Sequence, residues 1–473
     1  MNTPHNTKPG GIIEMIAIAL PMVVSQACDT IMIFTDRLFL ARLSPELMSA
    51  AMGGGLAAFT TMTFFLGVIG YSTALVAQYL GSGMKDRCSL VLTQTLMLAV
   101  AAYPLIILAR PLARVLFEFM GVSSAQMGPQ KTYYDILIFA SMISMSRIAF
   151  SSFFSGIGRT RIVMVASFAG MIVNIGMNYI LIYGKLGSPA FGIRGAAYGT
   201  IIGGVSTLAV LLAAYLSKKN SAEFGVQRSF RFDRATAMKL LRFGYPSGIE
   251  MFLNLVAFTV LVLTFHGHGA ATAAAATIMF NWDLVAFVPL LGIEIGVTSL
   301  VGRYMGSGDT NTADRSAMSG LKLGMVYSFF VFILFVGFAP RLVSMFRPDV
   351  VGPVYEQAFG LAVFMVRSAS LYVLIDAMIV AFVGALRGAG DTLWAMIITV
   401  AAHWATSAAA FISLRVFGAE PETAWVMIVC VFLFFSVVLY ARYRSGEWKR
   451  IRVVETVELP ETPPDYFHET RDL

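Results

Sequence analysis

Apolar segments bounded by charged residues, glycine or proline follow one another along almost the whole chain. Each contains about 20 residues or more, the length at which an α-helix crosses the hydrocarbon core of a bilayer. Because a backbone in lipid must satisfy its hydrogen bonds internally, such segments cross the membrane as helices. The pattern predicts an all-α polytopic membrane protein with twelve transmembrane helices, at residues 14–41, 50–80, 90–118, 132–156, 162–184, 194–217, 240–266, 272–302, 318–338, 355–386, 393–416 and 422–441.

The composition excludes several other classes of protein. Of the 473 residues, 57% are hydrophobic and 13% are charged, whereas soluble domains carry about 25% charged residues. A water-soluble fold and a disordered chain are therefore excluded. The cysteines, Cys28, Cys88 and Cys430, are too scattered for a disulfide framework or a metal site. We expect the first apolar segment to be retained, because no small-residue cleavage site accompanies it.

Lysine and arginine lie mostly on one side of the predicted membrane. With the N-terminus inside, 22 of the 34 basic residues fall in inner segments, Arg387 among them, and 10 fall in outer segments. Cytoplasmic loops carry the excess of basic residues in membrane proteins. We therefore expect an integral protein of the plasma membrane, of the bacterial inner-membrane type, with both termini in the cytoplasm.

The two halves of the chain repeat one another. Pro21 recurs as Pro246, and the pattern Leu-Val-x-x-Tyr-x-Gly-Ser-Gly at 75–83 recurs at 300–308, both at an offset of 225 residues. Six spans per half is an even number, so both halves enter the membrane from the same side. The repeat predicts two six-helix lobes related by a pseudo-two-fold axis along the membrane normal.

These boundaries divide the chain into an N-lobe over 1–217, a basic cytoplasmic linker over 218–239, a C-lobe over 240–441 and a cytoplasmic tail over 442–473. The linker interleaves basic residues with phenylalanine and leucine, which suits a segment that lies on anionic lipid headgroups. The tail begins basic and ends acidic and proline-containing, so we expect it to be loosely ordered.

Several ionisable side chains fall inside the apolar segments, where each costs at least about 2.5 kcal/mol on insertion scales. They are Asp29, Asp36, Glu250, Asp283, Glu294, Asp376, Arg147, Arg367 and His403. Acids that face a space between two lobes are typical of ion and substrate pathways. Arg147 and Arg367 are better explained as structural partners of buried acids.

Polar side chains reach one level in the outer half of the N-lobe. Asp36, Asn178 and Thr200 each lie six or seven residues from the charged residue that ends their helix, about 10 Å below the surface. Asn174 is one turn deeper than Asn178 on the same face, and Asp29 is two turns deeper than Asp36. Such oxygen ligands suit a proton or Na⁺, and none is soft enough for zinc or copper. The competing interpretation is hydrogen bonding between helices, worth about 0.6–2 kcal/mol.

A second group of acids is expected at one level in the C-lobe. Glu250 and Glu294 lie eight or nine residues from the inner ends of their helices, about 12–13 Å deep. Asp376 can approach them, with Tyr372 one turn further out, and Asn254 lies one turn above Glu250. Three acids near one level in a low dielectric cannot all be ionised, so at least one should hold a proton near neutral pH. A proton-coupled carrier needs that property.

Four stretches of the sequence resemble those of the multidrug and toxic-compound extrusion (MATE) transporters. They are Leu20-Pro21 with Phe34-Thr35-Asp36; 173–178 with 184–187 and 192–197; 244–248; and Leu371-Tyr372 with Asp376-Ala377 and 384–388. The resemblance covers about residues 14–440. It implies two six-helix lobes that form a V with substrate in the cleft, and export of cationic or amphipathic compounds in exchange for H⁺ or Na⁺.

The resemblance also implies roles for single residues. Asp36, Asn174, Asn178 and Thr200 match the cation site of the family's N-lobe, and Pro21 matches the proline at which the first helix bends.

Tyr372 and Asp376 match part of the family's C-lobe site. The chain departs from the family at position 254, where many relatives carry glutamate. It has Asn254 there, and the acid stands one turn earlier, at Glu250. Asp29 and Glu294 are also acids where relatives often have neutral residues. Our hypothesis is that Glu250 takes the role of the missing glutamate and binds a proton or a cationic substrate.

The leading interpretation is a secondary antiporter whose partners are an organic substrate, H⁺ or Na⁺ and the lipid bilayer. We expect a monomer without a cofactor, without a metal other than Na⁺ and without a nucleic-acid partner. A flippase for lipid-linked oligosaccharides is the alternative, since some members of the wider superfamily flip such lipids. A flippase would favour a cationic cleft, and a passive channel would need a continuous polar stripe or a ring of subunits. We expect no enzyme, because no Ser/His/Asp or Cys/His set presents itself.

Overall fold

The computed structural model describes residues 8–119, 122–348 and 352–455, which form helices joined by short turns. The first half contains α1 (Ile12–Ala41), α2 (Pro45–Gly70), α3 (Ser72–Gly81), α4 (Lys85–Phe119), α5 (Ser124–Phe139), α6 (Ser141–Gly156), α7 (Thr160–Tyr183) and α8 (Ile193–Leu216). Two short helices follow, α9 (Lys218–Glu223) and α10 (Val226–Ser229). The second half contains α11 (Arg234–His266), α12 (Ala270–Gly306), α13 (Thr310–Ser344), α14 (Pro353–Ala389), α15 (Thr392–Phe411), a π-helical turn (Ile412–Val416), α16 (Pro421–Arg444) and a 3₁₀ turn (Glu447–Arg450).

The predicted twelve spans are confirmed. Within the described ranges, 11 helices are long and apolar enough to cross a membrane, with α2 and α3 together counted as one. The pair α5 and α6, bent by 49° at its break, makes the twelfth. Several helices begin earlier than predicted, for example α13 at Thr310 rather than 318. They do so because a helix continues past its apolar stretch into polar turns that the bilayer does not require.

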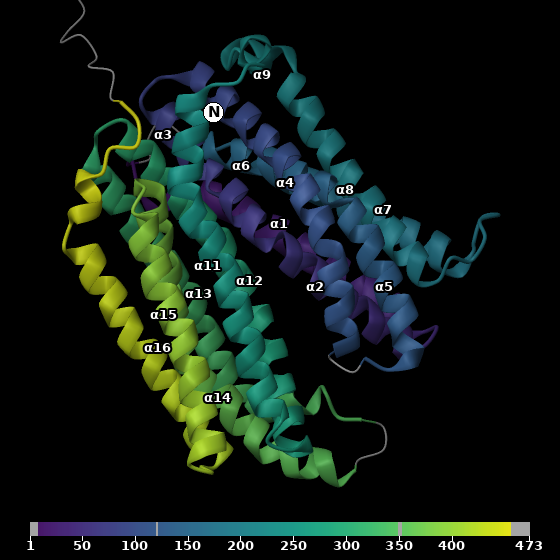
Figure 1. The fold of residues 1–473 in the computed structure, drawn as a ribbon. Coiled ribbons are helices and arrows are strands. Elements are labelled where there is room, and N and C mark those ends of the chain that lie inside the picture. Colours follow the sequence, from purple (N-terminus) through teal and green to yellow (C-terminus); the bar gives the residue numbers. More distant parts are fainter. Residues whose placement is uncertain (1–7, 120–121, 349–351, 456–473) are drawn as a thin grey trace, which may run out of the picture.

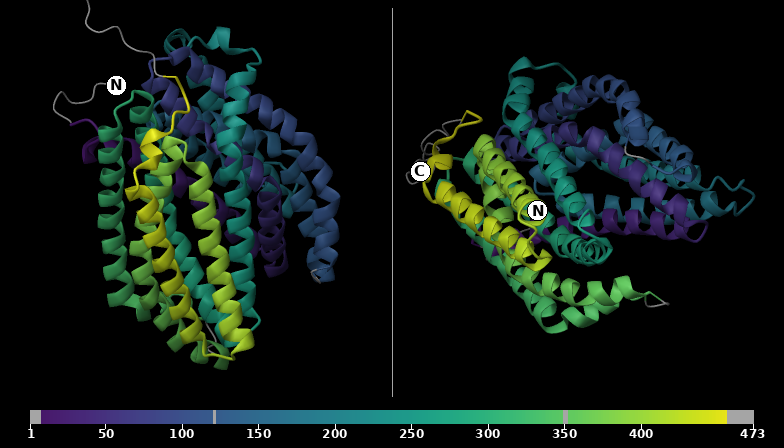
Figure 2. Two further views of the ribbon diagram at one scale, coloured as in Figure 1. Left: turned by 60° about the vertical axis from the view of Figure 1, so that its left-hand side comes forward. Right: turned by 60° about the horizontal axis from the view of Figure 1, so that its bottom comes forward.

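The two halves form two separate groups of helices (Figures 1 and 2). In Figure 1 the half with α1–α8 (purple through blue to teal) and the half with α11–α16 (teal through green to yellow) come together at the end that carries α9 and spread apart towards the other end. We call these the linker end and the distal end. The hydrogen bonds between the halves agree with this arrangement, since the Gln78 amide donates to the carbonyl of Gly388 at 2.7 Å and Ser299 donates to that of Ser155 at 2.7 Å.

The contacts between helices of the two halves are made by positions that the sequence repeat relates to one another. A Cβ built on Gly67 of α2 would lie 2.7 Å from the Cα of Gly248 in α11. A Cβ built on Gly292 of α12 would lie 2.7 Å from the Cα of Val23 in α1. Gly67 and Gly292 are 225 residues apart, and so are Val23 and Gly248. The α2–α11 and α12–α1 contacts are therefore the same contact made twice.

The same symmetry holds where α3 crosses the end of α12. A Cβ on Gly81 would collide with the carbonyl of Arg303, and one on Gly306 with the carbonyl of Gln78. Both pairs of positions are again 225 residues apart. The turns that follow are also alike, because Gly83 and Gly308 share a φ of 81°, which favours glycine. These reciprocal contacts confirm two lobes related by a pseudo-two-fold axis.

The linker and the tail contain more structure than the sequence suggests. α11 begins at Arg234, inside the expected linker, because the Asp233 carboxylate accepts a hydrogen bond from the amide of Thr236 at 2.8 Å and caps the helix. This hydrogen bond lowers the pKa of Asp233.

The expectation of a loosely ordered tail from residue 442 is wrong for the described part. α16 continues to Arg444, and Trp448 is fully buried, with its indole donating to the carbonyl of Tyr443 at 2.9 Å. Burial of the large indole ring against the helix bundle stabilises this segment, although the residues beside Trp448 are basic. The acidic and proline-containing end lies outside the described residues.

We predict that Gly67→Ala and Gly292→Ala each lower the thermal unfolding midpoint. The added methyl group would lie within 3 Å of the facing backbone in both variants, and overpacking of this kind costs about 1–3 kcal/mol. Gly337→Ala is the matched control, because a Cβ on this helical glycine meets nothing within 4 Å. Equal midpoints for all three purified variants would contradict the repeated contact.

Candidate ion and substrate sites

Asp36 of α1 is held by polar side chains of α7 and α8. The Asn178 amide donates to one carboxylate oxygen of Asp36, and the Thr200 hydroxyl donates to the other at 2.7 Å. The Asn178 amide also lies 3.3 Å from the amide oxygen of Asn174. Asp36, Asn174 and Asn178 are buried. The four side chains that the sequence grouped in the outer half of the N-lobe are therefore in direct contact.

A glycine stripe on α8 allows this contact. Gly195, Gly199 and Gly203 recur every four residues and face α7. A Cβ on Gly203 would lie 2.7 Å from the Cβ of Asn174, and one on Gly199 would collide with the amide oxygen of Asn178. Small residues at this spacing let membrane helices approach closely, which brings short polar side chains within reach of a neighbouring helix.

The N-lobe group has spare hydrogen-bonding capacity. Among the described residues, the Asn178 oxygen and the Asn174 amide nitrogen are buried without a partner, and no side-chain nitrogen of a lysine or arginine lies within 4 Å of the Asp36 carboxylate. Buried polar atoms are rarely left unpaired. The oxygens of Asp36, Asn178 and Thr200 are hard ligands, so the group fits a proton or Na⁺.

Tyr133 is a member of this group that the sequence analysis missed. It is buried on α5, next to Thr200 and within electrostatic reach of Asp36. The predicted fourth span placed this residue at its very start, where nothing in the apolar pattern marked it as a buried neighbour of α1 and α8.

Asp29 does not join the Asp36 group. Its carboxylate pairs with Arg147 of α6 at 3.0 Å, which confirms Arg147 as the structural partner of an acid. Two turns separate Asp29 from Asp36 along α1, and Arg147 of α6 contacts Asp29 at this deeper level. The placement of Asp29 in the coupling group is therefore not supported by its contacts.

In the C-lobe, Glu250 of α11 and Glu294 of α12 share one arginine. Arg387 of α14 pairs with Glu250 at 2.9 Å and also contacts Glu294. Thr399 of α15 donates to Glu250 at 2.8 Å, and the backbone carbonyl of Thr399 lies 2.8 Å from the ring of His403. Arg387 was assigned to an inner loop, and this was wrong, because α14 continues to Ala389.

A separate C-lobe group contains Asp283, Tyr372 and Asp376. The Tyr372 hydroxyl of α14 donates to Asp283 of α12, and Tyr372 stacks on Phe432 with 6.0 Å between ring centroids. Asp376, one turn along α14, is buried and close enough to Asp283 for the two charges to interact. Among the described residues, neither aspartate has a lysine or arginine within 4 Å.

The prediction that Glu250, Glu294 and Asp376 lie at one level is wrong. Glu294 lies beside Gly384, and Asp376 is eight residues from Gly384 along α14, which is about 12 Å at 1.5 Å per residue. Asn254 stands one turn from Glu250 with its amide oxygen buried and unpartnered among the described side chains. Counting residues to loop charges misplaced Asp376, because helices extend beyond the apolar segments by different lengths.

Two pseudo-symmetric lobes of membrane-spanning helices, each with buried acids, define a two-lobed membrane transporter. The sequence profile of the MatE family matches residues 21–180 and 246–409. The chain belongs to this family, which consists of transporters rather than enzymes.

Relatives of known name agree with this assignment. The chain is 26% identical over 448 residues to the "Probable multidrug resistance protein NorM" of Thermotoga maritima, covering 93% of this chain and 94% of the relative. It is 28% identical over 395 residues to the "Multidrug resistance protein PmpM" of Pseudomonas aeruginosa, covering 83% and 81%. Against the "Multidrug resistance protein NorM" of Vibrio cholerae the identity is 26%, with coverage of 83% and 84%.

Solved structures share the fold. A MOP superfamily transporter from Pyrococcus furiosus, described as having a binding pocket of reverse polarity, superposes with a TM-score of 0.83 at 21% identity. The outward-facing conformation of a multidrug resistance MATE family transporter gives 0.82 at 20% identity. Each comparison covers 94% of this chain and all of the other.

We predict that Arg387→Gln destabilises the protein and that Glu294→Gln in the same chain restores most of the loss. Removing one partner of a buried ion pair typically costs about 3–5 kcal/mol, because the remaining charge is left without compensation. The single variant leaves two carboxylates, whereas the double variant leaves one that Thr399 still contacts. Thermal unfolding of the unchanged protein, the two single variants and the double variant measures the coupling between Arg387 and Glu294. If the effects of the two substitutions on stability were additive, the shared ion pair would be contradicted.

Proposed function

We propose that the protein is a secondary antiporter of a bacterial inner membrane that exports cationic or amphipathic organic compounds in exchange for H⁺ or Na⁺. The observation that carries this proposal is the Asp36 carboxylate, which is buried and held by neutral donors alone. A carboxylate without a fixed cation in a membrane-spanning helix needs a mobile one. The names of the curated relatives support multidrug export as the activity.

The C-lobe acids supply a place for the exported compound. Asp283 and Asp376 have no fixed cation, and two such carboxylates favour a shared proton or an organic cation because their charges repel. Tyr372, which contacts Asp283, packs against Trp425 and Phe432 with ring centroids 6.4 and 6.0 Å from its own. Aromatic faces attract cations, so this group suits a flat cationic compound.

Exchange then follows from a shift between two conformations. If both termini are cytoplasmic, the lobes meet at the cytoplasmic side and spread apart away from it, as Figure 1 shows for their ribbons. A cation on Asp36 and a compound on the C-lobe acids would each favour a different conformation. The flippase alternative is less well supported, because the unpaired charges inside the lobes are acidic and would repel a pyrophosphate.

The variant Asp36→Asn should abolish gradient-driven efflux while the protein still folds. Asparagine can still accept from Asn178 and can donate to Thr200, so the contacts persist while the exchangeable charge is lost. Transport of ethidium by proteoliposomes under an imposed pH or Na⁺ gradient measures the effect. Asp29→Asn is the control, because Arg147 already neutralises Asp29 and coupling should survive. Normal efflux by the Asp36 variant, or equal loss in both, would contradict the proposal.

The pH dependence of dye binding should reside in the Asp283 group rather than in Glu250. Arg387 holds Glu250 in an ion pair, so Glu250→Gln should leave most of the pH dependence, whereas Asp283→Asn and Asp376→Asn should flatten it. Binding of a fluorescent organic cation to the purified variants, titrated against pH, tests this. If Glu250→Gln alone flattened the curve, Glu250 would take the role of the glutamate that relatives carry at position 254.

A further inference from the structure

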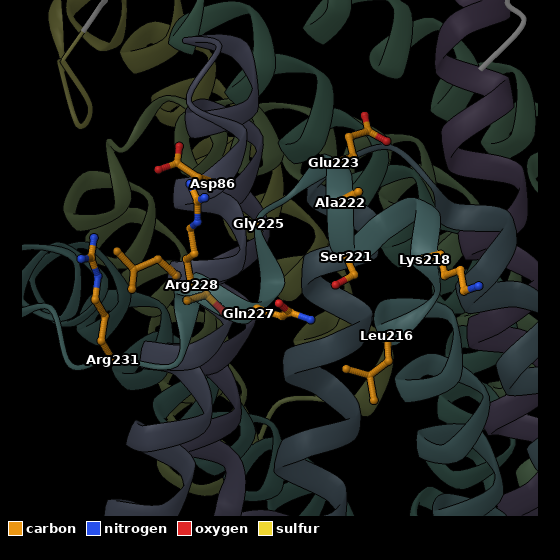
Figure 3. Close-up of a pocket in the computed structure, with 12 residues that line it drawn as sticks. Asp86, Leu216, Lys218, Ser221, Ala222, Glu223, Gly225, Gln227, Arg228 and Arg231 are labelled. Carbon is orange, nitrogen blue, oxygen red and sulfur yellow. The ribbon is translucent and has the colours of Figure 1, made fainter.

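A cavity lies away from the proposed ion and substrate sites, where the linker packs against the linker end of α4 and α8. It has a volume of about 980 Å³ and is lined mainly by α9, α10 and the residues that flank them (Figure 3). Its walls include Asp86 of α4, Leu216 of α8 and the basic residues Lys218, Arg228 and Arg231. The proposed antiport does not use this cavity.

The basic residues of the cavity are not neutralised by acids. Within the described ranges, Lys218, Arg228 and Arg231 form no ion pair, although two acids line the same cavity. Glu223 is already paired with Arg159 at 2.5 Å and with Lys85 at 3.2 Å. Three cations against the free Asp86 leave the cavity with an excess of positive charge.

The cavity also lies at the end of the span formed by α8, where lipid is expected to meet water. Leu216 ends the span formed by α8 and is 53% exposed. Phe230 and Phe232 flank Arg231 and are 66% and 67% exposed. Exposed aromatic rings beside basic residues are typical of segments that insert into the interface of a membrane. In Figure 3, Arg228 lies between Arg231 and Lys218, and Leu216 lies below Ser221 and Lys218.

We propose that this cavity binds the headgroup of an anionic phospholipid of the adjoining leaflet. Arg228, in the middle of the lining, would contact the phosphodiester; Ser221 and Gln227 add neutral hydrogen-bond donors, and Arg231 and Lys218, on either side of Arg228, add positive charge. The acyl chains would lie along the exposed apolar side chains at the end of α8, with Phe230 and Phe232 at headgroup depth. Asp86 disfavours a second negative charge and can accept hydrogen bonds from a hydroxylated headgroup, so phosphatidylglycerol fits the cavity.

The test is lipid binding to the purified full-length protein in detergent, titrated with phosphatidylglycerol and followed by native mass spectrometry. We expect R228Q/R231Q to weaken the affinity for phosphatidylglycerol about thirtyfold, since each basic residue near an anionic lipid surface contributes about 1 kcal/mol and two are removed. The matched control is K219Q/R234Q, which removes two exposed linker cations that do not line the cavity. It should change the affinity less than twofold. Thermal unfolding midpoints establish that both double variants are folded.

Three further results would overturn the proposal. Equal weakening by the two double variants would show that only the overall charge of the linker matters. Equal affinity for phosphatidylcholine would show that the cavity does not select an anionic headgroup. Protection against thermal unfolding by inorganic phosphate as strong as that by phosphatidylglycerol would identify a site for soluble anions.

Discussion

A carboxylate inside a membrane must be matched by a positive charge, and the four acidic groups described above within the two lobes meet this requirement differently. Glu250 and Glu294 share a fixed guanidinium from α14. Asp29 pairs with Arg147. Asp36, and Asp283 with Asp376, have only neutral neighbours within ion-pair distance in the described part of the chain. The distinction separates acids that hold helices together from acids that are free to exchange a ligand.

The unpaired acids depend on close helix packing for their surroundings. Gly199 of α8 leaves room for the side chain of Asn178, which contacts Asp36. The lobes meet each other by the same means, with glycine of α2 and α12 against the backbones of α11 and α1. Without a hydrophobic driving force between helices in lipid, such close contacts and hydrogen bonds must supply the association.

The sequence predicts the fold more fully than the site. Twelve spans and the repeat follow from apolar length and from a turn pattern that composition alone cannot produce. The Asp36 group was also predictable. Asp36, Asn178 and Thr200 lie only six or seven residues from a charged residue at the end of their helix, so their depth in the membrane can be counted. In the C-lobe the same counting failed, since α14 carries Arg387 inside the helix rather than after it. The pairing of Glu250 with Arg387 depends on the rotation of α11, α12 and α14 about their axes, which residue spacing does not fix.

The crossing of α3 and α12 is reciprocal: Gly81 faces Arg303 as Gly306 faces Gln78. A contact in which each side presents the same patch to the other is the geometry of an isologous homodimer. Such a geometry is what remains when the gene of a six-helix subunit, already paired with its own copy, duplicates and fuses. Fusion also lets the two subunits diverge, so that one could keep a small ion-sized group around Asp36 while the other acquired an aromatic-lined pair of acids.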